Sequence, residues 1–199
     1  MIGIPIQYPL TLSFKILALS SQFSVTDDSG RVIAWAAQKM FRLKEAVTIF
    51  SDSSKSEILF TIKADRVMDF GARYYFTDAQ GTTLGSVQRK GMKSIWRAEY
   101  YIFDGAISSF KIREENPWIK VADGLLDAIP FAELLTGFVL HPSYLVSREN
   151  GTPVMRIRKM AAFLESRFSI ERIAPMEREE EQRVLLSLIM LVLLERRRG

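Results

Sequence analysis

The chain has 199 residues, of which 48% are apolar and 25% charged, and its 27 Lys and Arg against 23 Asp and Glu give a net charge of +4. This composition is typical of a folded protein of one domain, expected over residues 1–199, and the small charge excess argues against a dedicated nucleic-acid-binding protein. The absence of Cys and the presence of a single His exclude disulfides, thiolate chemistry and two-histidine zinc motifs.

Apolar and polar residues alternate along several segments between residues 10 and 172. A period of two places one face of a strand on a core and the other in water, so the pattern predicts half-buried antiparallel strands. The predicted core-facing positions are Leu10, Leu12, Phe14 and Ile16; Ile58, Phe60 and Ile62; Trp96, Ala98, Tyr100 and Ile102; and Phe110 and Ile112.

Turn signals with Gly or Asn/Asp separate these segments and recur regularly, which favours a meander of hairpins in a barrel or sandwich. Residues 23–32 and 75–84 form a weak internal repeat of strand, turn and strand, and residues 144–154 form a looser third copy. The acidic residues of these turns do not have EF-hand spacing, so we interpret them as turn formers, not calcium ligands.

Residues 123–138 break the alternation. Their leucines predict one or two short helical turns that Pro130 interrupts. We expect a connection that packs on one end of the barrel, with a mobile lid as the alternative. The single histidine, His141, follows this segment and is expected to be structural.

Residues 177–198 carry the clearest helical signal, with Glu residues in the first turns and Arg residues in the last, as the helix dipole favours. Between them, the block 184–194 contains Ser187 as its only polar residue. A helix that is apolar all round must be enclosed by a membrane, a partner or its own domain. The strands before it can supply that enclosure, so the sequence predicts a closed β-barrel around a buried helix at residues 177–198.

Neither long apolar segment fits an export or membrane signal. The segment 9–18 has no Lys or Arg before it and contains Lys15, unlike a signal peptide. The block 184–194 has 11 residues, whereas a spanning helix needs about 20. We expect a cytoplasmic protein, with peripheral contact to membranes left open.

Two segments, 88–97 and 153–160, contain basic residues and no acidic ones. Basic hairpins of this kind can bind phosphate head groups, although a solvated outer face that protects strand edges is the alternative. In a strand, Arg156 and Arg158 share one face and Lys159 lies on the other. The candidate anion-binding residues are Arg89, Lys90, Lys93, Arg97, Arg156 and Arg158.

The chain resembles the tubby C-terminal-like superfamily, which includes tubby proteins, phospholipid scramblases and LURP-one-related proteins. The resemblance rests on the D-x-x-G turns at 27–30 and 78–81, on residues 85–90 and 96–105, and on the terminal helix. LURP-one-related proteins are the most similar group, because the chain is short and lacks a Cys-rich segment. The resemblance implies a barrel of about twelve antiparallel strands around a central helix.

The resemblance also implies a non-enzymatic binding or scaffold protein, with anionic phospholipids such as phosphoinositides or another protein as partner. No cofactor, metal site or nucleic-acid partner is expected. A small-ligand carrier or an enzyme with a cleft near residues 123–144 is one alternative, and a tail-anchored, scramblase-like protein is another. No Walker loop, G-x-S-x-G or G-x-G-x-x-G motif is present.

Removal of the chain from Val184 onward should abolish folding. Each buried Leu, Ile or Val contributes about 1.5–3 kcal/mol, so the ten apolar residues of 184–194 together rival the net stability of a whole domain. Thermal unfolding followed by circular dichroism checks this, with a chain that lacks only residues 196–199 as control. A cooperative transition of the shorter chain at the parent temperature would contradict a buried helix.

Overall fold

The computed structural model describes residues 6–17, 20–39, 46–66, 71–89, 99–115, 143–160 and 165–195. Its twelve strands form a closed antiparallel barrel in which each strand pairs with the next along the chain and β1 pairs with β12. The elements are β1 (Leu10–Leu17), β2 (Ser20–Thr26), β3 (Val32–Lys39), β4 (Val47–Phe50), β5 (Ile58–Ala64), β6 (Arg73–Asp78), β7 (Thr83–Arg89), β8 (Glu99–Asp104), β9 (Ile107–Glu114), β10 (Ser143–Arg148), β11 (Pro153–Met160), β12 (Ser166–Arg172) and α3 (Arg178–Glu195).

Most of the alternating residues line the inside of this barrel, as predicted. Leu10, Leu12 and Phe14 of β1 are buried, and Phe110 and Ile112 of β9 are fully enclosed. The expected core positions at residues 96 and 98, and the side chain at residue 16, lie outside the described residues. Because β1 pairs with β12 through Leu10 and Ile170, the barrel has no open edge between its first and last strands.

Five hairpins carry a register shift next to their turns: β2–β3, β4–β5, β6–β7, β8–β9 and β10–β11. In β4–β5, Ile49 pairs with Phe60 while Phe50 pairs with Ile58, so β5 has one extra residue. The extra residue brings Leu59 into the core and leaves Ile58 46% exposed. The prediction that Ile58 faces the core is therefore wrong, because simple alternation does not anticipate a β-bulge.

The turns of the predicted repeat share one local geometry. The Asp27 carboxylate accepts a hydrogen bond from the Arg31 backbone N–H at 3.0 Å, and Asp78 accepts one from the Thr82 N–H at 2.8 Å. Each of these hairpins has a glycine at positive φ three residues after the acid. The interpretation of the acids as turn formers is confirmed, and a bulged hairpin is the repeated unit of the barrel.

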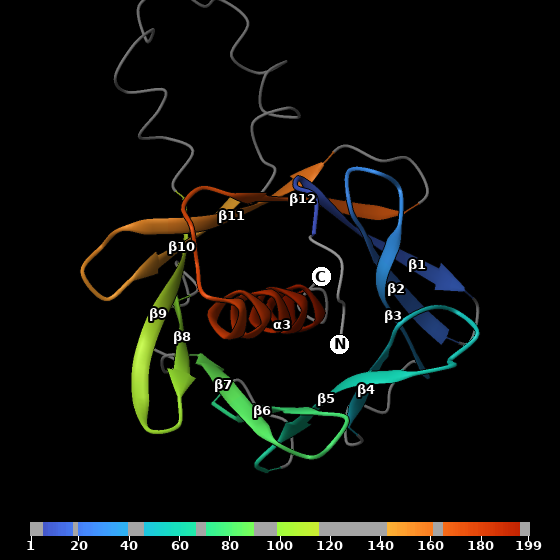
Figure 1. Cartoon of the computed structure of the whole chain (residues 1–199), viewed down its shortest axis with the longest axis horizontal. Helices are drawn as coiled ribbons and strands as arrows, with labels where there is room; N and C mark the ends of the chain where they lie inside the picture. Colours follow the sequence, from blue (N-terminus) through green and yellow to red (C-terminus); the bar gives the residue numbers. More distant parts are fainter. Residues whose placement is uncertain are drawn as a thin grey trace, which may run out of the picture.

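The helix α3 lies inside the ring of strands (Figure 1), as the sequence predicts. Its apolar residues from Leu188 to Leu194 are all buried. Ser187 is buried too, and its hydroxyl donates a hydrogen bond to the Arg183 carbonyl at 2.8 Å, so its polar group has a partner without water. The segment 123–138 and His141 lie outside the described residues.

One side of the barrel holds α3 more closely than the other, because Arg183 joins the helix to β7 and β8. Arg183 Nε donates to the Leu84 carbonyl at 2.6 Å, and its guanidinium lies 2.9 Å from an Asp104 carboxylate oxygen. Gly85 makes this approach possible, because a Cβ there would lie 2.7 Å from Arg183 Cδ and 2.4 Å from the Phe103 carbonyl oxygen. The helix therefore packs mainly against β6, β7 and β8.

Gly85→Ala should destabilise the barrel much more than an alanine at another glycine of positive φ. Gly151 has a φ of 87° and open space around it, so Gly151→Ala should cost about 1–2 kcal/mol of backbone strain alone. Gly85→Ala adds the collision with Phe103 and Arg183, for a total of about 3 kcal/mol or more. Urea denaturation of both variants measures the difference, and equal costs would contradict the close approach of α3 to β7.

Candidate functional site

Of the basic residues in the first predicted segment, 88–97, the structure describes Arg89, and this side chain lies inside the barrel. Arg89 ends β7, pairs in register with Tyr100 and is only 7% exposed. Its position lies on the same inward face as Val87, so its side chain does not lie on an outer hairpin surface. Lys90, Lys93 and Arg97 fall between β7 and β8, outside the described residues.

The second basic segment, residues 153–160, forms the strand β11, and two of its arginines lie on the outer face of the barrel. Arg156 and Arg158 share this face, but their charges have different surroundings. Arg156 makes two 3.0 Å hydrogen bonds to the Glu115 carboxylate and lies 3.8 Å from Glu171, so its charge is compensated. Arg158 is exposed and makes no ion pair within the part of the chain that the structure describes.

The three described candidates do not gather in one patch. The strands β7 and β11 lie on opposite sides of α3 (Figure 1), and β8, β9 and β10 separate them around the ring. Arg89 is also inside the barrel, whereas Arg156 and Arg158 are outside. The described basic residues of the two segments, 88–97 and 153–160, are therefore too far apart to bind the same anion.

Charge is distributed unequally between one end of the barrel and the rest of the chain. We call the end where the five bulged hairpins turn and α3 begins the turn end. It holds eleven Asp and Glu but six Lys and Arg, which leaves 12 acidic and 21 basic residues for the rest of the chain. The turn end comprises residues 27–31, 51–57, 78–82, 104–106, 148–152 and 172–183.

The first turn of α3 is joined to β10 at the turn end. Arg148 binds the Glu180 carboxylate through two hydrogen bonds of 2.6 and 2.8 Å. Glu180 also accepts a hydrogen bond from the Glu177 backbone N–H at 3.1 Å, which caps the start of the helix. The hydrogen bonds from Arg148 hold the pKa of the Glu180 carboxyl below its usual range.

A second cluster joins the helix to β12 and to the segment before β1. The Tyr8 hydroxyl donates to the Glu181 carboxylate at 2.8 Å, and Arg172 lies 3.3 Å from the same oxygen and stacks over the Tyr8 ring. Burial raises the pKa of the Tyr8 phenol, and the Glu181 carboxylate raises it further. Tyr8 therefore stays protonated and remains a hydrogen-bond donor.

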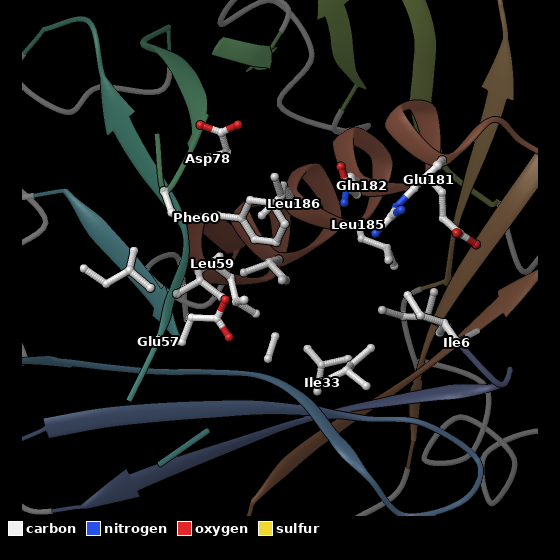
Figure 2. Close-up of a pocket in the computed structure, with 18 of the residues that line it drawn as sticks. Ile6, Ile33, Glu57, Leu59, Phe60, Asp78, Glu181, Gln182, Leu185 and Leu186 are labelled. Carbon is white, nitrogen blue, oxygen red and sulfur yellow. The ribbon is translucent and has the colours of Figure 1, made fainter. Parts of the chain in front are cut away.

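A cavity of about 640 Å³ lies beside α3, on the side away from β7. Its walls come from β12, β2, β3, β4 and β5 and from one face of the helix (Figure 2). The volume is in the range of small-molecule sites, about 300–1,000 Å³. Its lining is mostly apolar, with residues such as Ile33, Leu59, Phe60, Leu185 and Leu186.

The polar residues of the cavity lie at the turn end, which places its mouth there. They are Glu57, Asp78, Gln80, Arg172, Arg178, Glu181 and Gln182. No group of three or more acidic or His side chains in the described ranges is placed to hold a metal ion. Its mostly apolar lining, with polar residues gathered at one end, makes the cavity a candidate site for an organic ligand.

Sequence reasoning placed a cleft near residues 123–144 and missed this cavity. Residues 116–142 lie outside the described part of the chain, so that hypothesis stays a prediction. The sequence contains one signal for the cavity: two residues of β3 that face inward, Ala34 and Ala36, have small side chains. Small side chains facing a helix leave space unless the helix approaches closely, and α3 approaches the opposite wall instead.

A closed antiparallel barrel around a buried helix is the architecture of the tubby-like superfamily. The family model of LURP-one-related proteins matches residues 35–191, so the chain belongs to the LURP-one-related family. Membership in this family fits a binding or scaffold protein. No curated protein and no solved structure matches the chain. Within the described ranges, no helix has the length and apolar character needed to cross a membrane.

Glu180→Gln should lower stability at neutral pH by about 1 kcal/mol, because the amide keeps the helix cap but loses the ion pair with Arg148. A carboxyl with a depressed pKa in the folded state contributes stability that is present above its unfolded pKa and lost as the pH falls through the folded one. The difference between variant and parent should therefore begin to shrink as the pH falls below about 4.3, the unfolded pKa, and should disappear only below the lower pKa of the folded state.

Urea denaturation between pH 2.5 and 7 measures this difference. Glu179→Gln, on the same helical turn, is the matched control and should change stability by less than about 0.5 kcal/mol at every pH. A stability difference for Glu180→Gln that grows in acid would contradict the assignment of the ion pair.

Proposed function

We propose that this LURP-one-related protein is a non-enzymatic binding module that attaches to anionic phospholipid surfaces, phosphoinositides among them. The observation that carries the proposal is the acidic excess of the turn end against the basic excess of the rest of the chain. The turn end has eleven acidic and six basic residues, and the positive excess belongs to the rest of the chain. The turn end is the part of the protein that an anionic surface attracts least, so binding has a preferred orientation with the turn end away from the surface.

The basic residues proposed to contact head groups are Lys90, Lys93, Arg97 and Arg158. The first three belong to the connection that leaves β7 at the end opposite the turn end. Arg158 lies near the same end of β11 and is exposed. Each Lys or Arg near an anionic surface contributes about 1 kcal/mol, so four of them support reversible binding.

Arg89 and Arg156 have other roles in this proposal. Arg89 is buried at the end of β7, and Arg156 is held by Glu115 and Glu171. Removing either residue would disturb the barrel as well as the surface charge. Tests of lipid binding should therefore leave both in place.

Sedimentation with vesicles tests the proposal. The full chain should pellet with vesicles of phosphatidylcholine that contain phosphatidylserine or phosphorylated inositol lipids and not with phosphatidylcholine alone. Binding should fall when salt rises from 0.05 to about 0.5 M, since salt screens surface charge. Equal and negligible pelleting with all vesicles would remove the lipid part and leave a protein partner as the ligand.

Arg158→Glu should reduce pelleting several-fold, because it reverses an exposed charge near the proposed contact. Lys55→Glu is the matched control, with the same change of charge at the turn end, where Lys55 lies over the Trp35 ring. Thermal unfolding shows whether both variants stay folded. An equal loss of binding in the two would contradict an oriented contact.

A further inference from the structure

The interior cavity follows from the off-centre position of α3. A helix with its side chains is about 10–12 Å wide, and a twelve-stranded barrel encloses more space than one helix fills. Arg183 and Gly85 bring α3 close to β7, so the remaining space collects along β12 and β2–β5. A large empty apolar space is costly, because its lining loses packing contacts.

The body of the cavity suits an apolar molecule. Val25, Ala34, Ile49 and Ile170 come from four different strands and are 9% exposed or less, and Ile189 faces them from the helix. All charged residues of the lining belong to the turn end. A charged group carried into the body would lose its hydration without gaining a partner among the described residues, which is unfavourable.

At the mouth, the charges already have partners. Glu181 is held by Tyr8 and Arg172, and Asp78 accepts backbone N–H groups of its own turn. Glu57 and Arg178 also have interaction partners. Gln182 is half-buried and lines the cavity (Figure 2), and its side-chain amide makes no hydrogen bond within the described ranges.

We infer that this cavity binds a neutral lipid-like molecule, with one elongated apolar chain and an uncharged hydroxyl head. The chain lies between α3 and the wall of β2–β5, and the hydroxyl group lies at Gln182, whose amide both donates and accepts hydrogen bonds. This site is separate from the proposed phospholipid surface: it opens at the turn end and requires no anion.

Isothermal titration calorimetry with three ligands of equal chain length tests the inference: dodecan-1-ol below its solubility limit, and dodecanoate and dodecylamine below their critical micelle concentrations. The alcohol should bind the full chain with one-to-one stoichiometry and at least tenfold more tightly than either charged ligand. No saturable binding of the alcohol would overturn the inference, and tighter binding of either charged ligand would overturn the neutral head group.

Ala34→Phe should weaken binding of dodecan-1-ol at least tenfold, because the ring fills the body of the cavity. Ala37→Phe is the matched control, since Ala37 is exposed on the same strand. If the Phe variant does not fold, Ala34→Leu and Ala37→Leu replace the pair. A folded Ala34 variant that binds the alcohol as the parent does would overturn the location of the site.

Gln182→Leu tests the head-group contact. The variant should bind dodecan-1-ol several-fold more weakly while its thermal unfolding changes little, because Gln182 makes no hydrogen bond to the rest of the described chain. Unchanged affinity for the alcohol in this variant would overturn the role of Gln182. Phospholipid vesicle binding should be the same in all these variants, which distinguishes failure of the cavity site from failure of the proposed surface.

Discussion

The fold depends on the need to remove one apolar helix from water. The helix α3 is apolar on every face, so packing it on a flat sheet would leave half of it exposed. Twelve strands closed into a ring enclose its apolar part, and the helix in turn supplies the core that the inward faces of the strands require. Neither part has a satisfactory hydrophobic partner without the other, which makes the barrel and helix one cooperative unit.

Polar contacts decide where the helix lies within that ring. Apolar packing alone has little direction, whereas Arg183, Glu180 and Glu181 each make defined contacts with the strands or with Tyr8. These contacts all involve the first two turns of α3. They fix the position of the start of the helix, and because the helix is rigid, they also fix the position of its remaining turns. The absence of a side chain at Gly85 and the cavity across the barrel are two results of the same placement.

Sequence reasoning predicted the architecture because its signals are strong and local. Alternation of apolar and polar residues marks the strands. The block 184–194, apolar except for Ser187, indicates a helix that the rest of the chain encloses. It failed at Ile58, where a bulge reverses the facing of one residue, and it grouped Arg89 with outer residues because composition does not show which way a side chain points. The cavity was missed because its size depends on the distance between α3 and each wall, which no local pattern encodes.

The order of the elements along the chain has a consequence for biosynthesis. The ribosome makes all twelve strands before α3, and the first strand must wait for the last to close the ring. Until then the inward faces of the strands have no core, and such exposed apolar surface favours aggregation. Contacts between distant parts of the chain also slow folding. We therefore expect nascent chains of this protein to expose apolar surface of the kind that chaperones bind until the helix emerges.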